Sequence, residues 1–267
     1  MDNSNNSGKR KLAQAGLIAK GIVYCLVAVL AFMSAFQVMG RRASGADKEG
    51  ALKLVEEQTG GQVLLLVISL GLVCYSIWRM IEAFNRDGKS DSKKQWLKTL
   101  RYLFSAFIYL SLAFLAAKIA LNQSDGGGGK GSTETLVESL LSKPAGQALV
   151  VIVALIILGT GIYQIWYGLS EKYQKHVSSL NLHSQANRLL LISGKAGYLA
   201  RGLVWIVISY LIFRAAMQSD AAAAGNTSEA FAFLKNAAYG KWLLGATSVG
   251  LFGYGVFNFI RARYERL

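Results

Sequence analysis

Proline is almost absent from this chain of 267 residues, which has one copy, and histidine and cysteine occur twice each. The two cysteines, Cys25 and Cys74, both lie in apolar segments, which argues against a disulfide framework. The two histidines, His176 and His183, have no cysteine or carboxylate cluster beside them, whereas a structural zinc site needs about four ligands. We therefore expect no metal ion and no cofactor.

Catalytic patterns are also missing from the sequence. No histidine, serine or cysteine stands in a recognisable nucleophile arrangement, so no catalytic residue is assigned and the chain is predicted not to be an enzyme. No acidic residue occupies the middle of an apolar segment, which argues against a proton-coupled pump. A membrane enzyme acting on lipid stays open as a third class of function, and it would need a polar pocket with convergent groups.

Apolar residues are what the chain has in abundance. They make up 53% of the sequence, against 16% charged residues. Six apolar stretches have the roughly 20 residues that a helix needs to cross the hydrocarbon core of a membrane. Backbone groups in lipid must be satisfied within the segment, so all six are predicted to be helices in an all-α membrane protein. The six stretches are Leu17–Met39, Val63–Ala83, Leu100–Leu121, Ala148–Leu169, Leu199–Met217 and Trp242–Arg261.

The net charge of +14 is unevenly distributed between the two predicted sides of the membrane. The side that holds both termini sums to +13, and the side of the first, third and fifth linkers sums to +1. Positively charged residues concentrate on the cytoplasmic side of membrane proteins. Both termini are therefore predicted to be cytoplasmic, and the surplus is read as a topology signal that argues against nucleic-acid binding.

A motif repeated three times organises the chain. The runs Gly16–Tyr24 and Gly197–Trp205 share two glycines, a basic residue before the second glycine and a later aromatic residue, and Arg101–Tyr109 is a diverged copy. Each copy starts a unit of two spans, so the units are parallel repeats, and a pseudo-threefold arrangement is their natural packing. The predicted boundaries are a disordered tail at 1–10, repeats at 11–86, 98–173 and 190–267, and cytoplasmic linkers at 87–97 and 174–189.

Each outward linker carries a short apolar pattern with helical spacing, and Asp47 is a candidate N-cap for the first of them. We expect three short helices at the outer membrane surface. Small residues recur at matching positions of the spans and predict close helix packing. The residues assigned to helix packing are Gly21, Ala106, Gly202, Gly71, Cys74, Gly159 and Gly253.

The motif at Gly197–Trp205, its copy at Gly16–Tyr24, the run Gly50–Leu52 and the series Gly71, Tyr75, Trp78 resemble a bacterial family known as domain-of-unknown-function family 1206. The resemblance covers nearly everything after the polar tail and implies three tandem two-helix membrane repeats. It also implies a multi-pass protein of the bacterial inner membrane. It implies nothing specific about activity.

Basic residues inside the motif are the strongest candidates for a site. Lys20 and Arg201 lie several residues inside their spans, where a charge is unfavourable by about 2.5 kcal/mol or more at the bilayer centre. Their long side chains can extend to the headgroup layer, or they can line a pocket for an anionic lipid or ligand. The residues predicted to share such a cytoplasmic pocket are Arg79, Arg101, Lys195 and Arg261.

Lys118 and Arg214 match one another near the outer ends of their spans. They too can extend to the headgroups, or they can line a central path and select for anions. Two functions therefore lead. The first is a non-catalytic scaffold or binding module whose basic cytoplasmic rim holds anionic lipid, and the second is an anion-favouring channel along the pseudo-threefold axis. Partners left open are membrane lipids, a second copy of the chain and another membrane protein.

Overall fold

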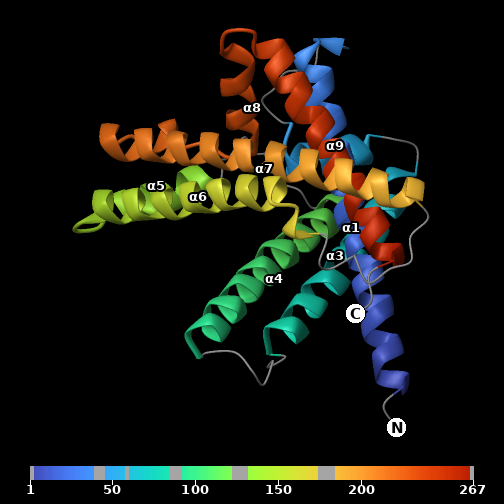
Figure 1. Cartoon of the computed structure of the whole chain (residues 1–267). Coiled ribbons are helices and arrows are strands. Elements are labelled where there is room, and N and C mark those ends of the chain that lie inside the picture. Colours follow the sequence, from blue (N-terminus) through green and yellow to red (C-terminus); the bar gives the residue numbers. More distant parts are fainter. Residues whose placement is uncertain are drawn as a thin grey trace.

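The computed structural model describes residues 3–38, 46–57, 60–84, 92–121, 132–173 and 184–264, and these residues form helices and short turns without any strand (Figure 1). Six of the helices are long and apolar enough to cross a membrane. The all-α prediction with six spans is confirmed. The long helices are α1 (Asn3–Ala35), α3 (Gly61–Phe84), α4 (Ser92–Ala120), α6 (Gly146–Leu169), α7 (Ser184–Gln218) and α9 (Gly240–Tyr264).

Helix α1 corrects one predicted boundary. Most of the segment 1–10, predicted to be a disordered tail, belongs to the helix, which begins at Asn3. Helices α4 and α7 likewise begin within the predicted linkers 87–97 and 174–189. Once a helix exists, each added residue gains a backbone hydrogen bond without a new nucleation step, so a span extends until a proline or a cap stops it.

A short helix precedes the second span of each repeat: α2 (Lys48–Glu56), α5 (Ser132–Leu141) and α8 (Thr227–Asn236). Asp47 caps α2, where its side chain accepts a hydrogen bond from the Gly50 N–H. Asn226 is the N-cap of α8 and forms a capping box with Glu229. A 3-10 turn, η3 (Ala221–Ala223), lies between α7 and α8, and Asp220 caps it.

The turn between the short helix and the second span has the same geometry in all three repeats. Gly60, Ala145 and Tyr239 adopt left-handed backbone conformations, with φ angles of 77°, 61° and 58°. The next residue is glycine each time, and a Cβ there would collide with a carbonyl oxygen of the short helix. The three turns therefore share one backbone conformation, although only the first has glycine at the left-handed position.

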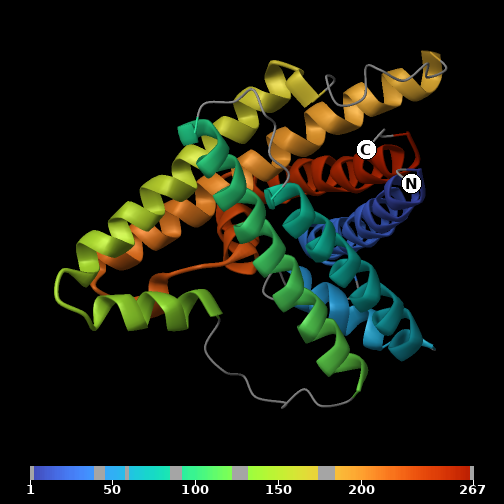
Figure 2. The same ribbon diagram turned by 90° about the horizontal axis from the view of Figure 1, so that it is seen from below.

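Packing pairs spans from different repeats. Helix α1 packs along α9, α3 along α4, and α6 along α7, and the three pairs point in different directions (Figures 1 and 2). The first span of each repeat thus lies against the second span of another repeat. Contacts of α1 with α3 and of α7 with α9 join the three pairs into one assembly.

Small residues occupy equivalent crossing points in the three pairs. A Cβ added to Gly21 would lie 2.5 Å from the ring of Phe259 and 3.0 Å from the Gly255 carbonyl oxygen. A Cβ added to Gly202 would lie 2.5 Å from Ile165 and 2.9 Å from the Gly161 carbonyl oxygen. At the third crossing the Ser76 hydroxyl donates to the Ala106 carbonyl at 2.7 Å. The small residue of the repeated motif therefore permits the closest approach of each pair.

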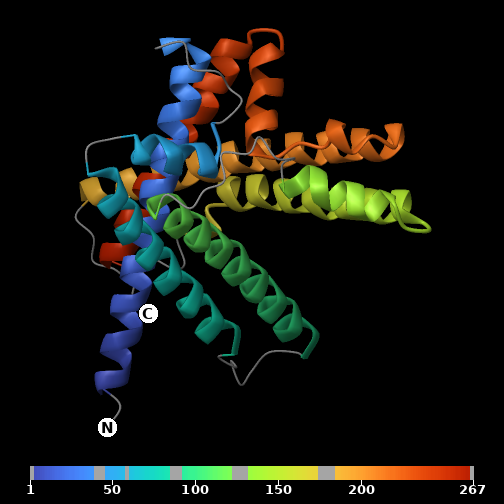
Figure 3. The same cartoon turned by 180° about the vertical axis from the view of Figure 1, so that it is seen from behind.

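Contacts within a repeat follow the same plan in repeats 1 and 3 only. A Cβ on Gly71 would lie 2.6 Å from the Cβ of Ala19, and a Cβ on Gly250 would lie 2.6 Å from the Cβ of Ala200. Repeat 2 has Phe104 and Ile156 at the positions of this alanine and glycine. The two spans of repeat 2, α4 and α6, do not pack along one another and splay apart (Figure 3).

This difference corrects one predicted packing residue. A Cβ added to Gly159 would meet no heavy atom within 4 Å, so no helix packs on it. Its counterpart Gly253 lies 3.4 Å, by the same measure, from the Ser193 carbonyl oxygen, and Cys74 is half-buried. Phe104 and Ile156, the large residues of repeat 2, are themselves exposed. A closed pseudo-threefold ring is not confirmed.

Candidate functional site

Lys20 is buried, with 5% of its surface exposed, although it lies in an apolar span. Its ammonium donates a hydrogen bond to the Tyr75 hydroxyl at 3.3 Å. The Nζ atom lies 5.2, 5.4 and 5.3 Å from the ring centroids of Tyr75, Tyr109 and Tyr254. Three rings therefore hold the ammonium of Lys20 inside the helix assembly.

Arg201, the counterpart of Lys20 in repeat 3, shares the ring of Tyr254 with Lys20. Its guanidinium carbon lies 4.3 Å from the centroid of Tyr254 and 5.4 Å from that of Tyr24. The Nε atom is buried and has no hydrogen-bond partner among the described residues. A buried donor without an acceptor is unfavourable by about 1–3 kcal/mol and more for a charged group, so this atom marks a place for an acceptor.

Arg79 on α3 contacts the same tyrosine as Lys20, Tyr75. Its Nε and Nη2 atoms donate to the Tyr75 hydroxyl at 2.9 and 2.7 Å, and its Nη1 atom pairs with the Glu82 carboxylate at 2.6 Å. The guanidinium also lies over the rings of Trp78 and Tyr102, at 4.4 and 5.0 Å. One phenol oxygen, that of Tyr75, therefore accepts hydrogen bonds from two cations.

Lys48 reaches the cluster from the short helix α2. Its ammonium lies 5.2 Å from the centroid of Tyr109 and 5.8 Å from that of Tyr24. Helix α2 is held by Ala51, Leu52 and Val55, which are buried against the spans. Burial raises the pKa of the Asp47 carboxyl at its N-cap above the ordinary value, although the hydrogen bond from the Gly50 N–H acts in the opposite direction. A cation predicted on the outward side thus faces the same ring as Lys20.

We call this group the cation–tyrosine cluster. Its four tyrosines are buried and come from four helices: Tyr24 on α1, Tyr75 on α3, Tyr109 on α4 and Tyr254 on α9. Tyr75 stacks edge-on against Tyr109 at 4.6 Å, and Tyr254 against Tyr24 at 4.8 Å. The cluster consists of Lys20, Lys48, Arg79 and Arg201 with Tyr24, Tyr75, Tyr109 and Tyr254.

Charge in the cluster is not balanced by protein carboxylates. Lys20, Lys48 and Arg201 have no carboxylate partner among the described residues, and Glu82 pairs with Arg79. Burying an ion is unfavourable by several kcal/mol, and a desolvated cation–π contact returns about 2 kcal/mol. The phenol rings can therefore hold the cations in place, but no carboxylate of the described residues balances Lys20, Lys48 and Arg201. An anion with several acceptor oxygens complements such a group.

The remaining predicted pocket residues are placed differently. Arg261 lies 5.7 Å from the ring of Phe257, within electrostatic range of Arg79 and Tyr254. Lys195 pairs with Glu171 at 3.5 Å, and the two side chains are partly exposed, at 44% and 42%. The side chain of Arg101 lies outside the described part of the structure. Arg261 is thus near the cluster, and Lys195 belongs to a surface ion pair.

The two candidate pore residues are not brought together. Lys118 is half-buried on α4 and Arg214 is exposed on α7, and these helices do not pack along one another. The first spans of repeats 1 and 2 contribute Tyr24 and Tyr109 to the cation–tyrosine cluster, and both residues are buried. The structure offers no geometric support for a ring of charge built from Lys118 and Arg214.

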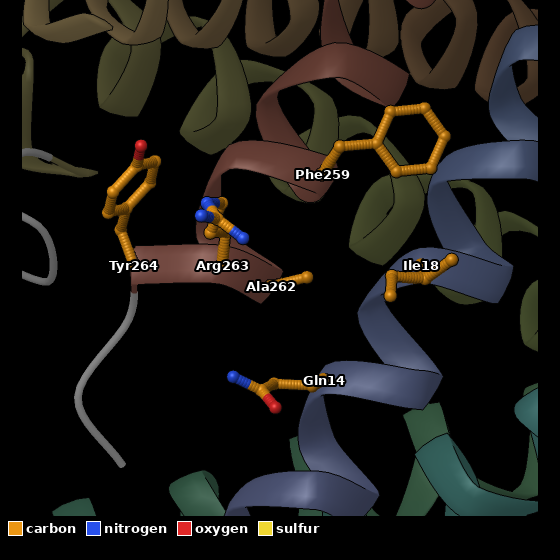
Figure 4. Close-up of a pocket in the computed structure, with 6 residues that line it drawn as sticks. All are labelled: Gln14, Ile18, Phe259, Ala262, Arg263 and Tyr264. Carbon is orange, nitrogen blue, oxygen red and sulfur yellow. The ribbon is translucent and has the colours of Figure 1, made fainter.

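A shallow pocket of about 590 Å³ lies between α1 and α9, near the C-terminal end of α9 (Figure 4). Gln14 and Ile18 line it from α1, facing Phe259 and Ala262 on α9. Arg263 and Tyr264 complete the lining but are exposed. The pocket is open and shares no residue with the cation–tyrosine cluster.

No group of three or more His, Cys, Asp or Glu side chains gathers into a metal site within the described ranges. His176 and His183 lie outside those ranges. The absence of a metal site and of a cofactor stays a prediction.

Comparison with known proteins places these repeats in a family. Segments 15–86, 100–171 and 196–265 each match the Domain of Unknown Function (DUF1206). The chain belongs to this family. It is also 28% identical to the "Uncharacterized protein YxxB" of Bacillus subtilis (strain 168) over 259 residues, which cover 97% of this chain and 92% of the relative. No solved structure matches the chain. The three matched segments confirm the predicted tandem repeats.

Sequence reasoning missed Lys48 and the four tyrosines as members of the site. The tyrosines carried a signal, because Tyr75 matches Tyr254 and Tyr24 matches Tyr109 between repeats. Lys48 carried none, because it lies in a linker that was assigned to the other side of the membrane.

Proposed function

We propose that this member of DUF1206 is a non-catalytic membrane binding module whose cation–tyrosine cluster holds an anionic group, that of an acidic membrane lipid. The observation that carries the proposal is the burial of Lys20 and of the Arg201 Nε atom among tyrosines without a carboxylate partner in the described residues. Buried cations are retained where they pair with an opposite charge. An anionic ligand supplies that charge.

The set of donors also suits a phosphate-type anion. The unpartnered Nε of Arg201 and the ammonium groups of Lys20 and Lys48 reach the cluster from three different helices. A phosphate offers several acceptor oxygens, which allows it to receive donors from different directions. The tyrosine rings between them exclude water and strengthen each charged contact.

We further infer that the protein resides in the bacterial inner membrane with both termini in the cytoplasm. The support is the surplus of positive charge on that side of the spans, +13 against +1. Fusions of a periplasm-dependent reporter enzyme to the C-terminus and to the segment 122–131 test this topology. The C-terminal fusion should be inactive and the fusion in the segment active, and the reverse pattern would contradict the orientation.

The binding proposal is tested by native mass spectrometry of the purified protein in mild detergent. The protein is loaded with equal amounts of an acidic and a zwitterionic phospholipid, and the lipid that stays bound is identified. We expect the native chain to retain the acidic lipid. The double variant Lys20→Gln/Arg201→Gln should retain at least about tenfold less, since removing a partner of a buried charged contact is unfavourable by about 2–5 kcal/mol.

The matched control is Lys118→Gln/Arg214→Gln, which removes the same net charge at corresponding positions of two other span ends. It should retain acidic lipid like the native chain. The conservative variant Lys20→Arg keeps the positive charge and should retain most of the acidic lipid that the native chain binds. Equal retention by the native chain and the Lys20→Gln/Arg201→Gln variant would refute the proposal.

A further inference from the structure

The three pairs of spans can be compared at one equivalent level, two residues before the repeated motif. Repeat 1 has Gln14 there, repeat 2 has Thr99 and repeat 3 has Lys195. The Thr99 hydroxyl on α4 donates to the Ala83 carbonyl of α3 at 2.9 Å. The Lys195 ammonium on α7 pairs with the carboxylate of Glu171, which follows α6, at 3.5 Å. At this level two of the three pairs are therefore bridged by a polar contact.

The pair of α1 and α9 has a pocket at the same level. Its volume is about 590 Å³, and Gln14 and Ala262, the counterparts of Thr99 and Ala83, both line it. Figure 4 shows the Gln14 amide extending from α1 toward the last turn of α9. Within the described part of the chain, no hydrogen bond joins the Gln14 side chain to α9. An open space thus stands where the other pairs have a contact.

The lining of the pocket changes from apolar to polar toward the ends of the two helices. Ile18 is 46% exposed and Phe259 is half-buried, and both lie in the apolar parts of their spans. Gln14 lies about one helical turn before Ile18, and Arg263 lies about one turn beyond Phe259. Among the described residues of the lining, Arg263 is charged and none is acidic. The pocket therefore has an apolar inner part and a positively charged outer part.

Arg263 distinguishes this pair of spans from the other two. The equivalent residues are Phe84 on α3 and Leu169 on α6, which are 72% and 56% exposed. Apolar side chains at this position suit the hydrocarbon of the membrane, whereas the long stem of an arginine places its guanidinium at the headgroup layer. There the guanidinium can donate two parallel hydrogen bonds to a phosphate. An anionic headgroup therefore complements the outer part of the pocket.

We propose that the pocket between α1 and α9 is a second lipid site. The headgroup of an acidic phospholipid meets Arg263 and Gln14, and one acyl chain lies along Ile18 and Phe259. The site shares no residue with the cation–tyrosine cluster, so it does not depend on the proposed function.

A soluble acidic peptide is the alternative occupant. It would satisfy the charge of Arg263, but its backbone N–H and C=O groups would lie against Ile18 and Phe259. Backbone polar groups that face hydrocarbon without partners are strongly unfavourable. The apolar inner part of the pocket thus favours the acyl chain of a lipid.

Photo-crosslinking in nanodiscs tests the site, because a lipid in a shallow, open pocket is expected to leave in detergent. A benzophenone amino acid replaces Ile18 in the full-length protein, which is reconstituted with equal amounts of acidic and zwitterionic phospholipid. The same replacement at Tyr264, which also lines the pocket, gives a second reading from an independent variant. The matched control positions are Phe84 and Leu169, which are exposed at the corresponding ends of the other two pairs. Mass spectrometry identifies the lipid attached at each position.

We expect the adducts at Ile18 to contain about fivefold more acidic phospholipid, relative to zwitterionic, than the adducts at the control positions. Fivefold is about the effect of one basic side chain near a membrane surface. Arg263→Gln should lower the ratio at Ile18 to that of the controls. Lys172→Gln, which removes the same charge beyond the end of α6, should leave it unchanged. Equal ratios at the pocket and control positions, or a raised ratio that survives Arg263→Gln, would overturn the site.

Two further measurements separate this site from other interpretations. Excess oligoglutamate added to the nanodiscs should leave the lipid adducts at Ile18 unchanged, and their loss would overturn the lipid in favour of an acidic peptide. Lys20→Gln/Arg201→Gln should also leave the ratio unchanged, and a lost ratio would overturn the separation of the two sites. Retention of acidic lipid through Lys20 and Arg201 in native mass spectrometry, without enrichment at Ile18, would overturn this second site and leave the proposed function standing.

Discussion

Repeats 1 and 3 pack their two spans together, and repeat 2 does not. In repeat 3 the glycine at 250 lies against Ala200, whereas repeat 2 has Ile156 and Phe104 at these positions. The same two repeats supply Lys20 and Arg201, and repeat 2 supplies Ser105. Divergence in packing and divergence in charge therefore fall on the same repeat. Repeat 2 therefore differs from the other two repeats both in its packing and in its charge.

The comparison also separates two kinds of interface. Packing between repeats survives in all three pairs, through Gly21, Gly202 and the Ser76–Ala106 hydrogen bond. Packing within a repeat survives only in two. The interfaces between repeats hold both spans of repeat 2, with α4 against α3 and α6 against α7. The second repeat can therefore lack an internal contact and still be part of the assembly.

The largest effect should come from imposing the residue of repeat 2 on repeat 3. Gly250→Ile places a bulky side chain where a single Cβ already lies 2.6 Å from Ala200 and 2.9 Å from the Ala196 carbonyl oxygen. Overpacking of this kind lowers the free energy of unfolding by about 3 kcal/mol. The midpoint of thermal unfolding in detergent measures it.

The matched control for this change is Gly159→Ile, the same substitution at an open position. We expect an effect within about 0.5 kcal/mol, as for exposed positions generally. Equal destabilisation by the two substitutions would show that the difference between the repeats does not lie in this packing.

The converse change should close the second repeat. Phe104→Ala with Ile156→Gly restores the small residues found at Ala19 and Gly71. Removing the two large side chains allows α4 and α6 to approach, because glycine and alanine let helix backbones come close. Spin labels at Leu110 and Val153, with Cys25 and Cys74 replaced by alanine, should report a shorter mean distance than in the parent chain.

The control for the converse change is Phe114→Ala, which removes an exposed ring of the same helix, α4, at a position other than 104. It should leave the label distance unchanged. A distance that is equally long in the double variant and in the parent would mean that other residues hold the two helices apart.

Removing an interhelical hydroxyl should have a smaller effect. Ser76 is 1% exposed and donates to the Ala106 carbonyl across the α3–α4 crossing. Ser76→Ala should lower the free energy of unfolding by about 1 kcal/mol, the range measured for side-chain hydrogen bonds between membrane helices. Ser111→Ala is the control, because the Ser111 hydroxyl bonds only within its own helix, to Phe107. Chemical unfolding in mixed micelles compares the two, and a larger loss in Ser111→Ala would contradict the assignment.

The smallest effect concerns the turn shared by the three repeats. Ala145 has a φ of 61° where repeat 1 has Gly60. Ala145→Gly should raise the free energy of unfolding by about 0.5–1 kcal/mol, because an L residue is strained in the left-handed region. Gly60→Ala should lower it by a similar amount. Opposite shifts in thermal midpoint check the pair, and shifts of the same sign would show that the turns differ.

Much of the fold could be read from residue types because the bilayer imposes a strict rule. Any stretch such as Val63–Ala83, apolar and about 20 residues long, has to satisfy its own backbone hydrogen bonds as a helix. The short helices were predictable for a similar local reason, since Asp47 and the apolar spacing of Ala51, Leu52 and Val55 lie within a few residues. The candidate site was predicted only in part, through Lys20, Arg79 and Arg201.

The sequence by itself determined the spans, the repeats and the small residues at Gly21, Ala106 and Gly202, because each depends on local composition and on internal similarity. Only the tertiary structure decided that spans pair between repeats, that Lys48 meets Lys20 over the ring of Tyr109, and that repeat 2 is open. These depend on which helix faces which. That choice is made by the summed packing of several helices, through side chains that are far apart along the chain.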